Sequence, residues 1–233
     1  MKIALFGYGK MGKMIEKTAL VRNHTIVAKI DVDSSETDLS QVDAAIDFST
    51  PDAAFGNIKK CLELSIPIIS GTTGWLNDYD KAVALCQEKN GAFIYASNFS
   101  LGVNVFFELN TYLAKMMKNL GEYALSMEEV HHTQKLDAPS GTAISLAEGI
   151  IENSDYESWE REKGSEKTIP IKSKRIADVP GTHSITYESK VDRIAIEHTA
   201  HNREGFALGA VVAAEWIQGK AGVFSMKDVL NLG

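Results

Sequence analysis

The chain has 233 residues and a formal net charge of −7, and hydrophobic residues make up 44% of it. This length suits one large domain or two modest ones, and the acidic balance argues against non-specific binding to nucleic acid or anionic lipid. No apolar run approaches the roughly 18 residues that cross a bilayer. Cys61 and Cys86 lack metal spacing, so we expect reduced core thiols in a cytoplasmic protein.

Apolar runs and helical patterns alternate through the first hundred residues. The pattern predicts strands over residues 3–6, 25–30, 44–48, 67–69 and 92–95. Helices are expected around residues 10–18, 51–64 and 77–89, the second with Thr50 as N-cap and Pro51 at its first position. Strands that alternate with helices indicate a parallel sheet covered by helices, a Rossmann-type α/β domain.

The pattern changes after about residue 101. Helices are predicted over residues 103–117 and 140–151, strands over 122–132, 168–176, 181–188 and 193–201, and an exposed loop or short helix over 152–167. This half is therefore an α+β domain with a mixed sheet. The last helix, about 205–218, carries one face of mostly small residues: Phe206, Gly209, Ala210, Ala213, Ala214 and Ile217. We expect a first domain of residues 1–101, completed by 205–233, and a second of 102–204.

A glycine loop between the first strand and the first helix carries the pattern G-x-G-x-x-G. Its residues are Gly7, Tyr8, Gly9, Lys10, Met11 and Gly12. Such a loop lets a pyrophosphate approach the free N–H groups of a helix N-terminus, and Asp31, about 20 residues on, is placed to accept hydrogen bonds from ribose hydroxyls. Asp31 favours NADH and Lys10 tolerates NADPH, so we expect either to be used. A tight turn with incidental glycines is the alternative.

Two further loops follow predicted strands at the edge where open parallel sheets bind ligands. They are Gly71-Thr72-Thr73-Gly74 and Ala96-Ser97-Asn98-Phe99-Ser100. Both offer backbone donors and little bulk, which suits the nicotinamide end of a cofactor. Turn chemistry alone is the alternative for each loop.

Residues 128–143, EEVHHTQKLDAPSGTA, place two histidines ahead of a lysine and a helix start. His131 and His132 point to opposite faces if they lie on a strand, and they lack a third ligand at metal spacing, so we expect no metal site. Lys135 follows at a distance that a turn can fold back. A polar loop with a capping serine is the alternative to a functional site.

The helix start after Lys135 completes a site for an anionic substrate. Ser140 is a plausible N-cap, and the exposed N–H groups from Gly141 onwards, with the Thr142 hydroxyl, suit a carboxylate. Arg203 could clamp a carboxylate, although a lone arginine is more often part of a surface ion pair. Alternatives for the same pocket, each favoured as structural by its local sequence, are His183, His198 and His201.

The spacing E-x-H-H-x-x-K-x-D-A-P-S-G-T-A resembles the motif of the 4-hydroxy-tetrahydrodipicolinate (dihydrodipicolinate) reductase family. The resemblance extends along the chain through GYGKMG, IDFSTP, SGTTGW, ASNFSLGVN, PGTHSI, HTAHNREGFALGAV and GVFSMKDVL. It implies a homotetramer that transfers hydride from NADH or NADPH to a cyclic dicarboxylic acid in lysine and diaminopimelate biosynthesis, with residues 102–204 binding substrate and forming the tetramer.

The resemblance also implies residue roles. His131 would be a proton donor or acceptor and Lys135 a proton donor, and which of them protonates the substrate stays open. The substrate-binding set is His132, Gly141 and Thr142, to which we add Ser140 and Arg203 from their positions. The cofactor-binding set beyond the glycine loop is Asp31, Gly71, Thr72, Thr73, Ala96, Ser97, Asn98 and Phe99, and we add Phe48 from the motif IDFSTP.

Two other functions are compatible with a dinucleotide fold. One is a non-catalytic NAD(P)-sensing regulatory protein, which would be expected to lose His131 or Lys135, and the chain keeps both. The other is a dehydrogenase of an acyclic amino acid, which leaves the helix start beside paired histidines unexplained. The chain departs from some family members at Val32, where they have arginine, in the short segment 34–42, and in a glycine loop that is one residue more compact.

Overall fold

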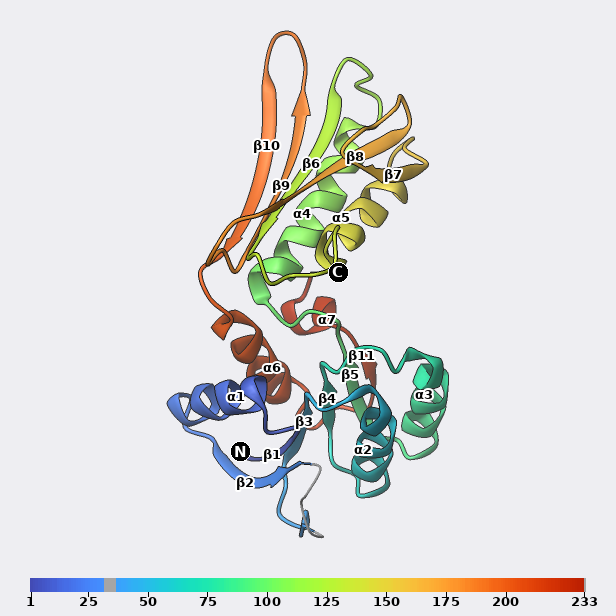
Figure 1. The fold of residues 1–233 in the computed structure, drawn as a ribbon. Coiled ribbons are helices and arrows are strands. Elements are labelled where there is room, and N and C mark those ends of the chain that lie inside the picture. Colours follow the sequence, from blue (N-terminus) through green and yellow to red (C-terminus); the bar gives the residue numbers. More distant parts are fainter. Residues whose placement is uncertain (32–36, 233) are drawn as a thin grey trace. The chain divides into compact units, whose positions relative to one another are not determined.

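The computed structural model describes residues 1–31 and 37–232, which form two compact units. The first unit combines Met1–Leu101 with Glu204–Gly233, and the second is Gly102–Arg203 (Figure 1). The chain therefore leaves the first unit once and returns to it. The family differences noted at Val32 and in the first part of segment 34–42 lie outside the described residues.

The described part of the first unit contains one sheet of six parallel strands in the order β11-β5-β4-β3-β1-β2. Its strands are β1 (Lys2–Phe6), β2 (Thr25–Ile30), β3 (Ala44–Asp47), β4 (Ile68–Ser70), β5 (Ala92–Tyr95) and β11 (Gly222–Phe224). All residues of β3 and β4 are buried, because helices lie on both faces of the sheet. This burial explains why the central strands are continuous apolar runs rather than alternating ones.

Helices cover the two faces of this sheet in two groups (Figure 1). One group is α1 (Lys10–Val21), α6 (Glu204–Trp216) and α7 (Met226–Leu230); the other is α2 (Pro51–Glu63) and α3 (Tyr79–Glu88), preceded by the 3₁₀ turn η1 (Leu76–Asp78). The small residues of α6 are buried as predicted, whereas Phe206 is only half buried and Ala207 takes the core position instead. The predicted α/β class of this unit is thus confirmed.

The second unit is built on a mixed sheet with the strand order β10-β9-β6-β8-β7. These strands are β6 (Ala124–His131), β7 (Ser158–Arg161), β8 (Thr168–Arg175), β9 (Gly181–Glu188) and β10 (Arg193–Ala200). Two helices, α4 (Leu101–Met117) and α5 (Gly141–Ile151), pack on one face of the sheet (Figure 1). Every second residue of β6 and β9 is buried, which is the alternation expected of a sheet with one covered face.

The structure corrects the predictions in three places. Residues 152–167 are not simply a loop, because Ser158–Arg161 pair in parallel with β8 as an edge strand that buries little and so lacks an apolar pattern. The strand β11 and the helix α7 were not predicted. The helix expected over 77–89 begins as a 3₁₀ turn at Leu76 and becomes α-helical at Tyr79.

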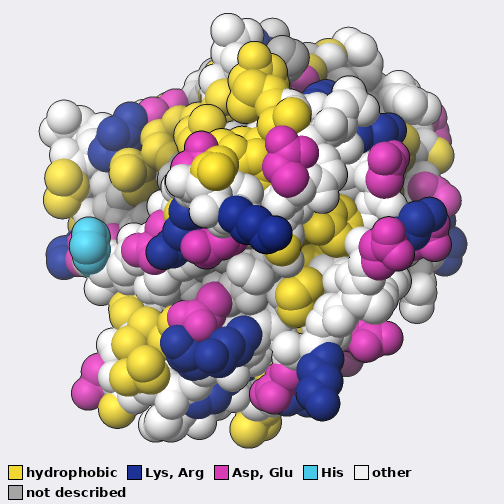
Figure 2. All heavy atoms as spheres, turned by 90° about the horizontal axis from the view of Figure 1, so that it is seen from above, with side chains coloured by type: hydrophobic (Ala, Val, Ile, Leu, Met, Phe, Trp, Pro, Cys, Tyr) yellow, Lys and Arg dark blue, Asp and Glu magenta, His cyan; other side chains and the backbone are white. Residues whose placement is uncertain are grey.

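Two expectations from composition can be compared with the structure. Cys61 and Cys86 are both free and buried, and burial raises the pKa of the Cys61 thiol to about 12, as expected of core thiols. Among the described residues, no helix combines the length and the apolar content that a membrane span requires. On the face drawn in Figure 2, Lys and Arg side chains lie interspersed with Asp and Glu side chains.

Candidate active site

The glycine loop lies between β1 and α1, and its glycines have different surroundings. Gly7 has a φ of +86°, and a Cβ added there would lie 2.2 Å from the carbonyl oxygen of Phe48. A Cβ on Gly12 would lie 2.3 Å from the Gly7 carbonyl oxygen, whereas a Cβ on Gly9 would meet nothing within 4 Å. Gly7 and Gly12 are therefore required by the packing of the chain itself. Gly9 leaves open space at the N-terminus of α1, which fits the approach of a pyrophosphate.

Asp31 lies beside this loop, since its Oδ2 is 3.4 Å from the backbone nitrogen of Tyr8. The Tyr8 ring is held by a cluster that the sequence did not indicate. Lys29 Nζ donates to Tyr8 Oη at 2.9 Å and lies 2.7 Å from Glu16 Oε1, and Tyr8 Oη also donates to Glu16. Lys10, the cation considered for NADPH, is exposed at the first position of α1. Of these two lysines, Lys29 is thus already paired with Glu16.

The other predicted cofactor loops lie at the carboxyl ends of the adjacent strands β3, β4 and β5. The Phe48 ring lies directly against Gly71, where an added Cβ would be 2.3 Å from the ring, and its centroid is 5.8 Å from that of Phe99. The Ala96 nitrogen donates to the Ser70 carbonyl at 3.2 Å, so the loops after β4 and β5 are joined. The structure therefore brings the glycine loop and these three segments to one edge of one sheet.

A buried carboxylate that the sequence reading missed holds these loops in place. Asp47, at the end of β3, is fully buried and accepts hydrogen bonds at 2.6–3.0 Å from the side chains of Ser49, Asn57, Ser70 and Thr72. Thr72 Oγ1 also accepts from the Ser49 backbone nitrogen at 2.9 Å. One acidic side chain thus fixes the loops that follow β3 and β4.

The register of the second sheet assembles a polar cluster on its helix-covered face. Glu129 on β6 is the cross-strand partner of Ser173 on β8 and of His183 on β9, and His183 in turn pairs with His198 on β10. His131 follows two residues after Glu129 on the same face. These side chains therefore lie together because strand pairing aligns them.

Glu129 and His131 are in direct contact within this cluster. His131 Nδ1 lies 2.6 Å from Glu129 Oε2, although the two are not aligned as a regular hydrogen bond, and the His131 ring meets the His183 ring edge-on at a centroid distance of 5.1 Å. Both Glu129 and His131 are buried. A Cβ on Gly181 would lie 3.0 Å from His131 Nε2, so the glycine leaves room for the imidazole.

Lys135 lies on the segment between β6 and α5, and Arg175 at the end of β8 holds that segment. Arg175 is the cross-strand partner of His131, and its guanidinium donates to the carbonyls of Lys135 at 3.3 Å and Asp137 at 2.6 Å. The Lys135 ammonium lies 2.9 Å from Asp137 Oδ1, and its hydrogen bond lowers the pKa of the Asp137 carboxyl. Lys135 is therefore placed on a fixed segment next to the histidine cluster.

The start of α5 lies against the same cluster. Ser140 is the N-cap, as predicted, and its Oγ accepts from the Ala143 nitrogen at 3.2 Å and lies 3.1 Å from His183 Nε2. The N–H groups of Gly141 and Thr142, in the first turn of α5, have no partner within the helix. They are therefore available to an anionic ligand.

The remaining predicted residues line a separate pocket of the second unit. His132 and Arg203 lie in a pocket of about 390 Å³ that is also lined by His201, Asn202 and the segment 177–180. His131 and His132 thus occupy different surroundings, as their adjacency on a strand predicted. His198 lies instead beside Gly102, whose added Cβ would be 2.9 Å from His198 Nε2.

Within this cluster, the Glu129 carboxyl is ionised and the His183 ring is neutral at pH 7. Burial acts to raise the pKa of the Glu129 carboxyl, but its polar neighbours His131, Ser140, Ser173 and Arg175 outweigh burial and hold the pKa far below its usual range. Burial, aided by the nearby His131, lowers the pKa of His183 to about 4. At neutral pH the site therefore contains a buried carboxylate beside a neutral His183.

The same three side chains have the composition of a metal site. Donor atoms of Glu129, His131 and His183 lie within 4.8 Å of one another. The other oxygen of Glu129, however, is already paired with Arg175 at 3.0 Å, and a guanidinium so close opposes a second cation. We interpret the cluster as an ion-paired network.

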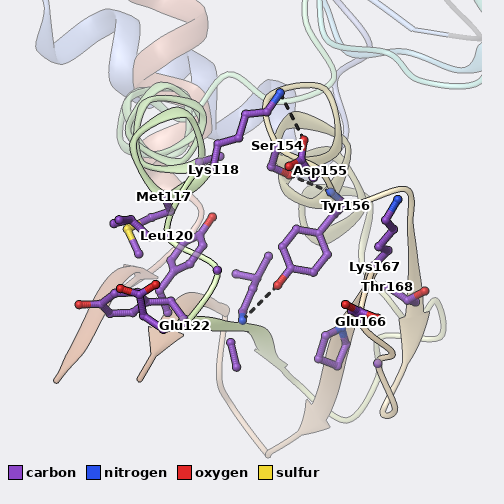
Figure 3. Close-up of a pocket in the computed structure, with 18 of the residues that line it drawn as sticks. Met117, Lys118, Leu120, Glu122, Ser154, Asp155, Tyr156, Glu166, Lys167 and Thr168 are labelled. Carbon is purple, nitrogen blue, oxygen red and sulfur yellow. Dashed lines mark hydrogen bonds and ion pairs between the residues drawn. The ribbon is translucent and has the colours of Figure 1, made fainter. Parts of the chain in front are cut away.

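A larger pocket of the second unit contains none of the predicted site residues. It has a volume of about 590 Å³ and lies at the end of α4, with Lys118, Tyr156 and Thr168 among its lining residues (Figure 3). Lys118 pairs with Asp155 at 3.4 Å across its rim, and Tyr156 Oη accepts from a backbone nitrogen of β6 (Figure 3). Both lysines of this pocket, Lys118 and Lys167, are thus already paired with carboxylates, which leaves it without a free cation for an anionic substrate among the described residues.

Comparison with known proteins identifies the family. Residues 1–99 match the family model described as dihydrodipicolinate reductase, N-terminus, and residues 102–230 match the model of its C-terminus. The chain belongs to the dihydrodipicolinate reductase family. This reductase is therefore an oxidoreductase, and the resemblance inferred from its motifs is confirmed.

Relatives and solved structures agree with this assignment. The reductase is 57% identical over 234 residues to the 4-hydroxy-tetrahydrodipicolinate reductase of Christiangramia forsetii, covering 99% of this chain and 98% of that protein. It is 34% identical to the enzyme of the same name from Archaeoglobus fulgidus, over 99% and 100% of the two chains. A dipicolinate-bound dihydrodipicolinate reductase from Paenisporosarcina sp. TG-14 has the same fold, with a TM-score of 0.78, 22% identity and 97% coverage of both chains.

Proposed function

We propose that this chain catalyses the NAD(P)H-dependent reduction of 4-hydroxy-tetrahydrodipicolinate to tetrahydrodipicolinate in lysine and diaminopimelate biosynthesis. The observation that carries the proposal is the arrangement at the start of α5. There His131 contacts the buried Glu129 and lies against His183, which in turn contacts Ser140 at the start of the helix. The segment that carries the Lys135 ammonium leads into the first turn of α5, whose backbone N–H groups have no partner within the helix. No observation favours the non-catalytic sensor, since the residues needed for proton transfer are present.

The substrate is a dianion, and the second unit offers groups for both of its carboxylates. The Gly141 and Thr142 amides at the positive end of α5, with Ser140 as its cap, suit one carboxylate. His132 and Arg203 line one pocket and suit a second anionic group. A cationic local site explains how an acidic protein binds an acidic substrate.

Proton transfer is assigned to His131 and Lys135. His131 is 8% exposed and is held by a carboxylate, so its ring is fixed for general acid or base work. Lys135 has a short ion pair to Asp137 and can exchange this partner for a substrate carboxylate or donate a proton. Both residues are proton carriers in the proposal, which leaves open the order in which they act.

The cofactor is NADH or NADPH, and it supplies the hydride when bound. The open space at Gly9, the carboxylate of Asp31 and the loops at Gly71–Thr73 and Ala96–Phe99 fit a dinucleotide at the carboxyl edge of the first sheet. The 2′-phosphate of NADPH would find the exposed Lys10 nearby, and Lys29 only if it leaves Glu16. We therefore propose dual use.

The homotetramer belongs to the same proposal. Among the described residues, α4 and α5 cover only one face of the second sheet. The other face carries rows of small polar side chains, such as Thr182 beside Thr199 at 3.0 Å and Ser184 donating to Glu197 at 2.9 Å. A second copy of this face is the partner we propose, in a cytoplasmic enzyme.

The test is a coupled assay. Nicotinamide absorbance is followed with purified protein after the condensation product of pyruvate and aspartate semialdehyde is supplied, with NADH and NADPH in parallel. We expect oxidation of both cofactors that depends on the condensation product. A folded protein that binds NADH and leaves it unoxidised would reject the proposed function.

A further inference from the structure

We propose that Glu129 and Arg175 are positioning residues for proton transfer: Glu129 fixes the ring and tautomer of His131, and Arg175 ties Glu129 to the segment that carries Lys135. This inference rests on the proposed function for its catalytic consequence. Its structural core, the pairing of Glu129 with His131 Nδ1, can be tested without any substrate.

The first step is that Glu129 is an anion with no access to water. Its side chain is fully buried on the helix-covered face of the second sheet, where an unpaired carboxylate would be very costly. One oxygen lies 3.0 Å from an Arg175 nitrogen, and the other lies 2.6 Å from His131 Nδ1. The carboxylate stays ionised in these surroundings because Arg175 donates to one oxygen and His131 Nδ1 closely contacts the other, and such neighbours keep its pKa low.

The second step concerns the tautomer of His131. An ionised carboxylate can only accept hydrogen bonds, so the nitrogen that faces it, Nδ1, must carry the hydrogen. The neutral ring then has its lone pair on Nε2, which becomes the nitrogen that exchanges a proton with substrate. Glycine at position 181 avoids crowding this nitrogen, since a Cβ there would lie 3.0 Å from Nε2.

The third step is the set of contacts made by Arg175. Its Nε donates to the Lys135 carbonyl at 3.3 Å, and one terminal nitrogen donates both to the Asp137 carbonyl at 2.6 Å and to Glu129 at 3.0 Å. Its other terminal nitrogen donates to the Lys174 carbonyl at 2.7 Å. One planar guanidinium thus joins the buried anion to the backbone on both sides of Leu136. A lysine ammonium cannot reproduce this geometry.

The fourth step is that other groups around His131 do not replace Glu129. The charged or titratable groups facing it are Glu129, Arg175, Lys135 and His183. Lys135 and Arg175 are cations, and His183 is neutral near pH 7. Glu129 is therefore the one anion of this set, and only its carboxylate can accept the Nδ1 hydrogen of His131.

The catalytic test compares Glu129→Gln with Glu128→Gln. Glu128 is the matched control, because it is the preceding residue, points to the opposite face of β6 and pairs with Lys174 at 2.8 Å. We expect Glu129→Gln to lower kcat by about 10²–10⁴-fold, since a glutamine amide can stabilise the wrong tautomer. The KM for the dicarboxylate should change less than about threefold, because Glu129 is proposed to act through His131 and not on the substrate.

A second variant tests Arg175. We expect Arg175→Lys to lower kcat at least tenfold while the Kd for NADH, which binds the first unit, stays within twofold. Glu129→Asp should recover part of the activity lost in Glu129→Gln, because the charge is kept. Wild-type kcat in Glu129→Gln, or equal losses in Glu128→Gln, would overturn the positioning role.

The structural test needs no activity. Histidine ¹⁵N chemical shifts of the wild-type protein, with the His131 signal assigned from His131→Asn, report which ring nitrogen carries the hydrogen. We expect Nδ1–H in the wild type and a change towards Nε2–H in Glu129→Gln; Nε2–H in the wild type would overturn the inference even if Glu129→Gln does not fold. If the wild type shows Nδ1–H but no reductase activity, the proposed function fails and the pairing stands.

Discussion

The glycines that follow β1 differ in what an added methyl group would contact. Gly9 faces open space, whereas Gly12 touches the Gly7 carbonyl. We expect Gly9→Ala, at the N-cap of α1, to lower the free energy of unfolding by no more than about 1 kcal/mol but to weaken NADH binding about tenfold or more, because the new Cβ would occupy the space proposed for the pyrophosphate. Gly12→Ala should instead destabilise the fold by about 2 kcal/mol. Urea unfolding and NADH titration distinguish the two variants.

Gly56 provides the control for these substitutions. It is exposed in the interior of α2, and an added Cβ would meet nothing within 4 Å. Gly56→Ala should stabilise the protein by about 0.5–1 kcal/mol and leave NADH binding unchanged. If Gly9→Ala behaves like Gly56→Ala in the NADH titration, the glycine loop is not the pyrophosphate site.

Lys135 is expected to act in chemistry rather than in cofactor binding. Lys135→Ala should lower kcat by about 10²–10⁴-fold, the usual effect of losing a proton donor, while the Kd for NADH changes little. The exposed Lys172, also in the second unit, is the control, and Lys172→Ala should retain wild-type kcat. Parallel losses of kcat and NADH affinity in Lys135→Ala would indicate a structural role.

At the residue scale, the groups proposed to act on the substrate could be found in the sequence more readily than the groups that hold them in place. His131, Lys135 and Ser140 stood in one short motif and could be read together. Glu129 stood in the same motif, two residues before His131 and thus on the same strand face, which was the signal available for it. Arg175 is 46 residues from Glu129, and only the pairing of β6 with β8 brings them together.

At the scale of elements, the end of β3 anchors the loops that we propose to bind the cofactor. Asp47→Ala would remove the acceptor of four side-chain donors in a buried position. We expect a loss of about 3 kcal/mol in the free energy of unfolding, together with weaker NADH binding because the Thr72 loop loses its anchor. Asp80→Ala, at an exposed position in α3, should change stability by less than about 1 kcal/mol. Equal unfolding curves for the two variants would contradict this role of Asp47.

Elements with strong periodicity were predicted to within a few residues, and elements without it were missed. The central strands and the helices bury enough apolar surface to show a pattern. The edge strand β7 has a single half-buried Trp159 among exposed residues, and β11 spans only Gly222–Phe224 with no fully buried residue. Both exist because a neighbouring strand offers hydrogen bonds, and a single sequence does not display that partner.

At the scale of the whole molecule, acid should weaken the fold through His183. Its pKa is 6.5 in an ordinary environment and about 4 in the folded protein, so unfolding takes up a proton between these values and stability falls as the pH is lowered through this window. Protonation of His183 can lower the free energy of unfolding by at most about 3 kcal/mol. Glu129, whose pKa is depressed by folding, adds to the same trend below its ordinary value of 4.5.

Urea unfolding of the intact chain at several pH values from 7.5 to 4.5 measures this dependence. We expect His183→Gln to be less stable at neutral pH but to lose less stability per pH unit than the wild type below pH 6.5. A variant with the wild-type slope would show that His183 does not carry the effect.

The discontinuous first unit has a consequence for how the protein is made. β5 lies next to β11, and β11 is contributed by residues 222–224, which follow the whole second unit in the chain. While a ribosome is still synthesising the middle of the chain, the nascent sheet has an open β5 edge, and the face that α6 covers is bare. Residues 204–224 must be synthesised and must leave the exit tunnel before that edge is sealed. A message truncated after residue 203 would therefore yield a polypeptide that exposes the unpaired edge of β5 and is prone to aggregation.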